Sequence, residues 1–479
     1  MPEFDHRDAR TLVHTPDGAD KLLSSRRTLA ASALAGMAGL LAAHQAAAST
    51  PALGSSSAKL GAAGHGLTID VMAFGAMGDG MKDDATAINE ALDAVRAHHA
   101  KAGRYPIGCR IVLPAGVYVI DSPLNFTNLR AVNTLIDGCG SVLVGRCAGQ
   151  PVIDALGARW LTMRDLTILG DSAAVPSVGL QIGLTSAHIV ADDHRFENVK
   201  ILGNFTLACL YNRSAETTGF DHVLLWNGQR GSFCLIQDGM NHFDVTSAFV
   251  LVDIPRDTEL SFNENIFINC DFRHDVEGTP VWLGDTSRHA FIRCYSATKK
   301  GPSFIVYCGS NSHTMLDIDC HCETSSLEDI FHFSAKGNVL RIRGFSYRDH
   351  TSFAQHAVFA CDPHITHIYI EHARIDVAGY WHKTCLVFAD PARWSVSGSY
   401  YSGVDEPWNG NSAFTGTLFL GGKMALIGNV RLKAEAGSTS DRPGGLGSSD
   451  EGLLFLDKSI SKLLVWSGDG WIDSNGQLY

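Results

Sequence analysis

The sequence predicts an all-β fold in which the chain winds as a parallel β-helix, a single-stranded solenoid of about ten coils that starts with a capping helix. Two observations carry this prediction. Short apolar segments recur about every 24 residues from residue 160 onward, and a glycine- and aspartate-rich turn precedes a helical pattern near residue 84. Stacked coils bury an apolar face and pair strand edges that a single coil leaves open. An antiparallel sandwich has similar strand spacing, but hairpin turns such as Asn227-Gly228 are scarce between the segments.

The repeated segments share one position that can be aligned, with apolar residues around it. Asn198 and Asn269 stand just before this position. Asparagine tolerates the left-handed backbone conformation, so both residues suit a tight bend between two strands of one coil. The aligned residues are Leu166, Val199, Val223, Thr246, Cys270, Cys294, Cys320, Gly344, His372, Gly398 and Asn429.

The segment from Val71 to Leu92 joins a short apolar run to a turn and then to a helical pattern. Its glycines supply backbone angles that other residues resist. Asp83 and Asp84 would cap a helix near residues 84 to 99, because carboxylates satisfy the free amide donors at a helix start. The apolar residues with helical spacing are Ala87, Ile88, Ala91, Leu92 and Val95.

The core of this segment, Phe74-Gly-Ala-x-Gly-Asp-Gly-x-x-Asp-Asp84, resembles the N-terminal signature of the pectate-lyase-like superfamily, in its rhamnogalacturonase/epimerase-like form. The resemblance covers about twenty residues. It implies a right-handed parallel β-helix, in a superfamily whose members act on polysaccharides. It also implies that this segment caps the solenoid and does no chemistry, so the resemblance bears on fold more than on reaction.

Residues 1–48 have the pattern of a twin-arginine-type signal peptide. Arg26 and Arg27 precede an apolar run, Leu29 to Ala43, and small residues suited to cleavage follow it. A membrane-spanning helix is the alternative, but the run is short and only mildly hydrophobic. We therefore expect export of a folded protein to the periplasm or the medium, without stable membrane insertion once the signal is removed.

The mature chain divides into four expected parts by composition. Residues 49–66 form a flexible leader and residues 67–433 the β-helix domain. Residues 434–452 form a Gly/Ser-rich linker, and residues 453–479 a small tryptophan-containing element. This last element resembles the terminal element of some phage tail-spike and exopolysaccharide-associated proteins. It would cover the open end of the solenoid or present a sugar-binding platform.

Charge and cysteine usage limit the partners. The formal net charge is −12 and charged residues are 18%, which disfavours nucleic acid as a partner. Twelve cysteines in an exported protein would ordinarily suggest disulfides. Three of them occupy the aligned position, where a small buried side chain is needed, and folding in the reducing cytoplasm would leave thiols unpaired. We expect mostly free, buried thiols.

Candidate site residues were sought at matching offsets on neighbouring coils, because stacked strands repeat about every 4.8 Å, close to the length of a sugar. A solvated polar edge is the alternative interpretation of all of them. The catalytic candidates are Lys299, Arg273, His321, Asp271, Asp275 and Glu323, and the substrate-binding candidates are His274, Arg348, Glu216 and Asp238.

The residue types fit two reactions on a polysaccharide substrate. In β-elimination from a uronate, a cation neutralises the carboxylate and Lys299, Arg273 or His321 removes the adjacent proton. In hydrolysis, two of Asp271, Asp275 and Glu323 would flank the bond. Of the motifs that polygalacturonases carry in order, Asp192-Asp193 lies early and Gly64-His65-Gly66 lies in the leader rather than in the coils, which lowers the case for that type of hydrolase. Ca²⁺ would suit a carboxylate-lined groove but cannot be placed. A noncatalytic glycan-binding or envelope protein stays open, and the sugar, the linkage and the oligomeric state are not predicted.

Overall fold

The computed structural model describes most of the solenoid coils and a small C-terminal element, with gaps within and between them. The described residues are 67–101, 108–130, 133–184, 191–238, 264–284, 288–308, 314–324, 331–335, 339–343, 346–349, 359–361, 367–371, 374–377, 394–397, 400–402, 412–414, 419–421, 435–447 and 452–479. The expected signal peptide and leader, residues 1–66, lie outside them.

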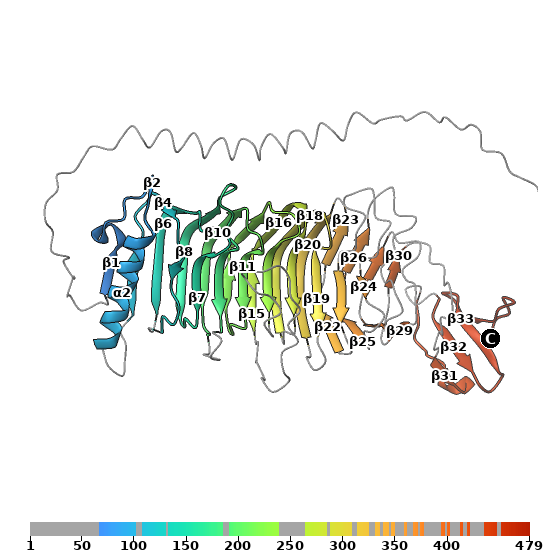
Figure 1. Ribbon diagram of the computed structural model, residues 1–479. Helices are drawn as coiled ribbons and strands as arrows, with labels where there is room; N and C mark the ends of the chain where they lie inside the picture. Colours follow the sequence, from blue (N-terminus) through green and yellow to red (C-terminus); the bar gives the residue numbers. More distant parts are fainter. Residues whose placement is uncertain are drawn as a thin grey trace, which may run out of the picture. The chain divides into compact units, whose positions relative to one another are not determined.

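Parallel strands stack one behind another in three sheets of these described residues (Figure 1). The expected all-β parallel β-helix is confirmed. The 17-stranded sheet holds β1 (Leu67–Asp70), β2 (Asp79–Asp83), β3 (Cys109–Val112), β4 (Val117–Ile120), β6 (Thr134–Gly145), β8 (Leu161–Gly170), β10 (Arg195–Gly203), β12 (Gly219–Asp221), β13 (Leu224–Asn227), β15 (Asn265–Ile268), β16 (Asp271–Glu277), β18 (Arg288–Lys300), β20 (Thr314–Thr324), β22 (Val339–Arg343), β25 (His367–Glu371), β27 (Trp394–Ser397) and β29 (Ser412–Phe414).

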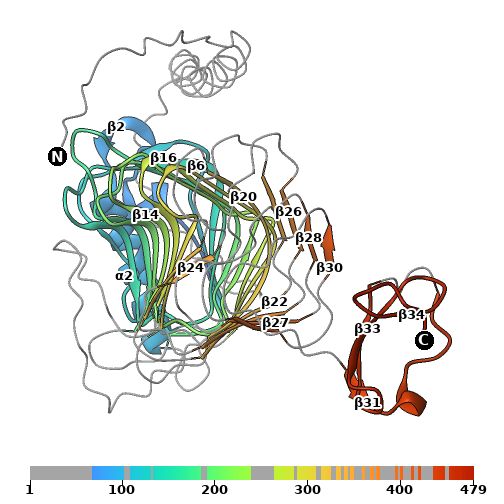
Figure 2. The same cartoon turned by 90° about the vertical axis from the view of Figure 1, so that its right-hand side faces the viewer.

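Two smaller sheets complete the coils. Figure 2 looks along the stack and shows the chain passing from the 17-stranded sheet to the next sheet in each coil. The nine-stranded sheet holds β5 (Leu124–Asn125), β7 (Pro151–Leu156), β9 (Val178–Gly183), β11 (Ala208–Arg213), β14 (Phe233–Asp238), β17 (Thr279–Gly284), β19 (Phe304–Cys308), β21 (Phe331–Ala335) and β24 (Phe359–Cys361). The four-stranded parallel sheet holds β23 (Ser346–Asp349), β26 (Arg374–Val377), β28 (Tyr400–Ser402) and β30 (Phe419–Gly421).

The N-terminal turn and helix form as predicted. The short 3₁₀ helix η1 (Val71–Phe74) leads into the turn, and α2 (Ala85–Lys101) follows β2. The buried Asp84 carboxylate accepts the backbone N–H of Met77 at 2.6 Å and that of Gly78 at 3.3 Å. Asp83 accepts the N–H of Ala85 at 3.1 Å, at the helix start. The two aspartates therefore hold the turn and the helix together through backbone donors.

In several coils a residue with left-handed backbone conformation bends the chain within the 17-stranded sheet and divides it into a first and a second arm. Asn198 has φ of 50° and Asn269 has φ of 53°, so both predicted bends are confirmed. Asn198 also donates from Nδ2 to Asp165 Oδ1 of the preceding coil at 2.7 Å, which links the bends. The same backbone conformation occurs at Asp165, His222 and Arg293.

The aligned position forms a buried column just after these bends. Phenylalanines of the first arm stack beside it, with ring centroids 4.5 Å apart for Phe220 and Phe267 and 4.8 Å for Phe267 and Phe291. Their planes differ by only 3° and 7°, so the rings stack face to face in parallel along the solenoid. The column residues, each at most 3% exposed, are Leu166, Val199, Val223, Cys270, Cys294 and Cys320.

One predicted coil is not where the repeat placed it. Thr246 lies outside the described residues, and β12, β13 and β14 pair directly with β15, β16 and β17. No coil therefore stands between these two sets of strands, and the segment 239–263 is an insertion at the end of β14. The aligned residues Gly344, His372, Gly398 and Asn429 also lie outside the described residues.

Nine of the twelve cysteines have described side chains, and all nine are free thiols. Only Cys139 is exposed, so the expectation of free, buried thiols holds for this part of the chain. Burial raises the pKa of Cys147 to about 11, which keeps that thiol protonated.

The C-terminal element is a small separate sheet with its own core of Phe455, Leu464 and Trp471. Its elements are β31 (Glu435–Gly437), η2 (Thr439–Asp441), β32 (Leu454–Asp457), β33 (Lys462–Trp466) and β34 (Trp471–Ile472). The expected linker begins with structure that belongs to this sheet, because β31 pairs with β32 and Arg442 binds the buried Asp457 at 2.6 Å. Across the described residues, no helix has both the length and the apolar character to cross a membrane.

Candidate functional site

The outer face of the second arm brings several predicted residues together. Parallel pairing puts Asp271, Tyr295 and His321 in register on β16, β18 and β20, and side chains alternate across a strand. Arg273 projects from the same face of β16 as Asp271. We call Asp271, Arg273, Tyr295 and His321 the Arg273 surface.

Arg273 is fixed by two contacts on this surface. Its Nη2 lies 2.6 Å from Asp271 Oδ2 and its Nε donates to Asp271 Oδ1 at 2.9 Å. Its guanidinium carbon lies 5.1 Å from the centroid of the Tyr295 ring, a cation–π distance. The hydrogen bond with Asp271 raises the pKa of Arg273, so this half-exposed side chain stays a cation.

Tyr295 joins Arg273 to His321. The Tyr295 and His321 rings stack with centroids 5.8 Å apart and planes 25° apart. Trp226 of β13 is in register with Arg273 on the other side and is partly exposed. Because β16 and β20 lie on opposite sides of β18, Arg273 and His321 approach the Tyr295 ring from its two sides and form one row of a cation, a phenol and an imidazole.

Lys299 shares the face of Tyr295 but lies four residues farther along β18, about 13 Å away at 3.3 Å per residue. The structure therefore places Lys299 and His321 at different ends of one arm rather than around one sugar ring. The neighbouring Lys300 binds Glu277 at 3.1 Å. Glu323 is in register with Ala297, beside the Arg273 surface.

Two candidates from β16 lie off this face. Asp275 occupies the irregular part of the strand, where the register shifts between His274 and Glu277. His274 is only 2% exposed and lies inside the coil, where Nε2 is 3.1 Å from Ser232 Oγ. Burial lowers the pKa of His274, which favours its neutral form. An inward residue of this kind cannot reach a glycan on the outer face.

Two of the remaining binding candidates, Asp238 and Glu216, lie on other surfaces. Asp238 is buried at the end of β14 in the nine-stranded sheet, where Tyr211 Oη donates to it at 2.9 Å. Glu216 lies in the turn before β12, in a backbone bridge with Asp192. Arg348 is on β23, a strand that contacts β20. Asp238 and Glu216 do not join the Arg273 surface in the described structure.

Sequence reasoning missed Tyr295 and Trp226 because only charged residues were searched. A signal was available for Tyr295, which follows Asp271 by one repeat and precedes His321 by another. No group of three or more His, Cys, Asp or Glu side chains suited to a metal ion occurs among the residues with described placement.

Comparison with known proteins supports the fold and the N-terminal resemblance. The family described as rhamnogalacturonase A/epimerase, pectate lyase-like, matches residues 68–174. The expected resemblance is confirmed, and over these residues the chain is pectate-lyase-like. No curated protein matches the chain.

Three solved structures illustrate what the fold resembles. ORF18 of Geobacillus virus E2 has 13% identity and a TM-score of 0.49, covering 86% of this chain and 85% of its own. PfbA, a surface adhesin of Streptococcus pneumoniae, has 11% identity and a TM-score of 0.40, with 74% and 91% covered. The A-module of the Azotobacter vinelandii mannuronan C-5 epimerase AlgE6 has 14% identity and a TM-score of 0.34, with 74% and 99% covered.

Proposed function

We propose that this protein cleaves an acidic, uronate-containing polysaccharide by β-elimination on the Arg273 surface. The observation that carries the proposal is the fixed cation Arg273, placed over Tyr295 with His321 stacked beside it on the next coil. The matched family, whose description names a rhamnogalacturonase and an epimerase, supports a polysaccharide as the substrate.

Arg273 would bind the uronate carboxylate. Its Nε and Nη2 face Asp271, which leaves Nη1 to donate to the substrate. A permanent cation at this place lowers the free energy of the enolate that forms when the proton beside the carboxylate leaves. Because the guanidinium is fixed by Asp271 and Tyr295 before substrate arrives, little reorganisation is needed during the reaction.

Two groups would move protons. His321 would take the C5 proton, and the electron pair of that bond would form the C4–C5 double bond as the C4–O bond breaks. Tyr295 would donate its hydroxyl proton to the departing oxygen. Lys299 is the alternative base: it lies two residues beyond Ala297, the register partner of Arg273, on the side of Arg273 away from His321. Variants of Lys299 and His321 therefore show on which side of Arg273 the proton leaves. General base catalysis contributes roughly 10²–10⁴-fold to the rate.

Hydrolysis by paired carboxylates is the second candidate reaction. Asp271, Asp275 and Glu323 are its candidate residues. Asp271 is bound through both oxygens by Arg273, so it would have to leave this ion pair to attack a sugar. The ion pair therefore favours elimination, and a noncatalytic glycan-binding role needs none of these proton transfers.

The test is an assay of the mature protein on uronate polysaccharides, because the unsaturated product of elimination absorbs ultraviolet light. Arg273→Ala should lose about 10²-fold or more in rate, as expected for one preorganised donor. Arg288→Ala is the matched control, since Arg288 is 49% exposed against 48% for Arg273 and also pairs with a carboxylate. His321→Gln should lose activity and Lys299→Gln should retain it; the reverse result would make Lys299 the base.

Other outcomes of this assay would overturn the proposal. New reducing ends without ultraviolet absorbance would show hydrolysis. Binding of a uronate glycan without any cleavage would show a binding protein.

We also propose that the protein works in the periplasm or outside the cell, exported by the twin-arginine pathway. The paired Arg26 and Arg27 before the apolar run are the support for this location.

A further inference from the structure

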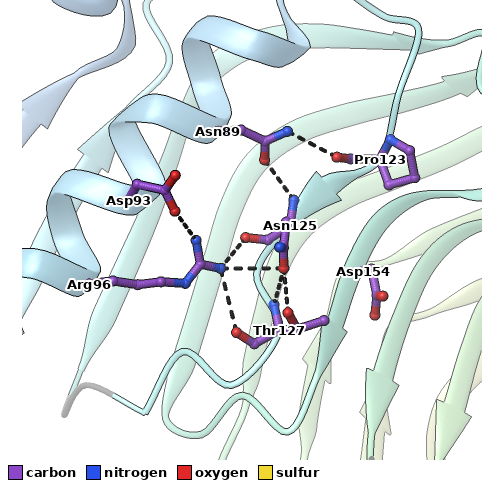
Figure 3. A pocket seen from close by; sticks show the side chains of 7 residues that line it. All are labelled: Asn89, Asp93, Arg96, Pro123, Asn125, Thr127 and Asp154. Atoms are coloured by element: carbon purple, nitrogen blue, oxygen red, sulfur yellow. Dashed lines mark hydrogen bonds and ion pairs between the residues drawn. The ribbon is translucent and has the colours of Figure 1, made fainter.

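A second polar pocket lies far from the Arg273 surface, where α2 meets the first strand of the nine-stranded sheet (Figure 3). Its volume of about 480 Å³ is in the range that holds a small ligand. The sheet supplies β5 and β7, and the helix closes one side. The lining residues are Asn89, Asp93, Arg96, Pro123, Asn125, Thr127 and Asp154.

Side chains of α2 fix one wall of the pocket. Asn89 Oδ1 accepts the backbone N–H of Asn125 at 2.8 Å, and Asn89 Nδ2 donates to the carbonyl of Pro123 at 3.0 Å. Arg96 donates to the carbonyls of Asn125 and Thr127 and to Asp93. These bonds satisfy the open edge of β5, so Asn89 and Arg96 are committed to the fold.

The amide of Asn125 is held in one orientation. Its Oδ1 accepts the backbone N–H of Thr127 at 3.0 Å, the Thr127 hydroxyl, and Arg96 Nη2 at 3.4 Å. Three donors at one atom require that atom to be the oxygen, so the donor Nδ2 is left for another partner.

Asp154 lies directly beside this amide. Asn125 and Asp154 are in register on the neighbouring parallel strands β5 and β7, about 4.8 Å apart, and both line the pocket. Asp154 Oδ1 accepts the backbone N–H of Leu156 at 3.2 Å. Among the described residues, Asp154 has no ion-pair partner within 4 Å, so a fixed donor and a carboxylate acceptor stand side by side.

We infer that this pocket binds a neutral sugar through two adjacent hydroxyl groups, one accepting from Asn125 Nδ2 and one donating to Asp154. Hydroxyls both donate and accept, so a neighbouring pair matches a donor beside an acceptor. A uronate would bring a second carboxylate against Asp154 and is disfavoured. Burial raises the pKa of Asp154, which also fits a site for an uncharged ligand.

The ligand class separates this site from the proposed catalytic surface. The Arg273 surface would select an anionic sugar, whereas this pocket would select a neutral one. It would hold a single unit or a chain end, because α2 stands beside β5, the last strand of the nine-stranded sheet at this end. The inference does not depend on the proposed function.

The experiment measures binding of neutral methyl hexosides and of the matching methyl uronates to the mature protein by saturation-transfer NMR and calorimetry. Neutral glycosides should bind and uronates should not compete. Asp154→Asn and Asn125→Asp each remove one half of the pair without changing size, and Asn125→Asp keeps an oxygen for Arg96. Each should weaken binding by about tenfold or more, the effect of a hydrogen bond of about 1.4 kcal/mol or more.

Asp121→Asn is the matched control, because the Asp121 side chain is 44% exposed, pairs with Arg146 and does not line this pocket. Its affinity should stay within about twofold of the wild type. Thermal unfolding of each variant excludes loss of fold as the cause. Absence of binding by every neutral glycoside, equal binding by the Asp154→Asn variant, or preferential binding of uronates would overturn the inference. The ultraviolet assay of the Asp154→Asn variant measures catalysis independently of neutral-sugar binding. Failure of this inference can therefore be told apart from failure of the catalytic proposal.

Discussion

Acidification from pH 7 to pH 5 should destabilise the solenoid through two buried histidines, His194 and His289. Burial lowers the pKa of His194 to about 4 and that of His289 to about 3. His194 Nδ1 lies 3.4 Å from the backbone nitrogen of Leu161 and accepts its N–H, which requires a neutral ring. The unfolded chain has an ordinary histidine pKa of about 6.5 and takes up protons that the folded state excludes. The contribution of the two neutral histidines to the free energy of unfolding is therefore complete above pH 6.5. It falls as the pH decreases towards their pKa values in the folded state.

The size of the loss of stability follows from how far the pH lies below the unfolded pKa of histidine. Each pH unit between the two pKa values costs about 1.4 kcal/mol per histidine. At pH 5 the loss is about 2 kcal/mol for each residue and about 4 kcal/mol for both. Burial raises the pKa of Asp84 and Asp154, which adds stability on acidification, but comparison of variants at one pH cancels that contribution.

Urea unfolding of the mature chain at pH 7, 6 and 5 measures this slope. His194→Gln keeps an acceptor for Leu161, and His194→Gln with His289→Gln should remove most of the loss between pH 7 and pH 5. His222→Gln is the control, because this histidine side chain is 64% exposed. A double variant with the wild-type slope would refute the reasoning.

Two further predictions concern the core and export. Phe267→Ala should lower the free energy of unfolding by about 4 kcal/mol for the cavity and about 1 kcal/mol more for its two stacked neighbours. Phe205→Ala, in an equally buried residue, should show only the cavity cost in the same urea titration; equal losses would contradict the stacking term. Replacing Arg26 and Arg27 with lysine should leave the precursor uncleaved inside the cell, because the pathway reads arginine rather than charge. Normal processing of the double variant on an immunoblot would remove the export proposal.

The candidate site was predicted in part. Asp271, Arg273 and His321 were placed on neighbouring coils from the repeat, and the register confirms that they share one face. His274 was grouped with Arg273, although alternation along a strand sends adjacent residues to opposite faces. The position of Lys299 shows the other error, since a match in coil number does not fix the distance along the strand.

Local sequence determined the elements that depend on backbone conformation and periodicity. The bends at Asn198 and Asn269, the start of α2 and the buried column of cysteines follow from residue type at a fixed spacing, because neighbouring residues alone set those conformations. Tertiary structure decided which coils are neighbours. Direct pairing of β13 with β16 puts Trp226 beside Arg273. The contact of α2 with β5 forms the pocket that Asn125 and Asp154 line. Such pairings depend on which apolar faces and strand edges pack best over the whole chain. The spacing of a sequence repeat does not show whether a segment between two strands forms a coil of its own.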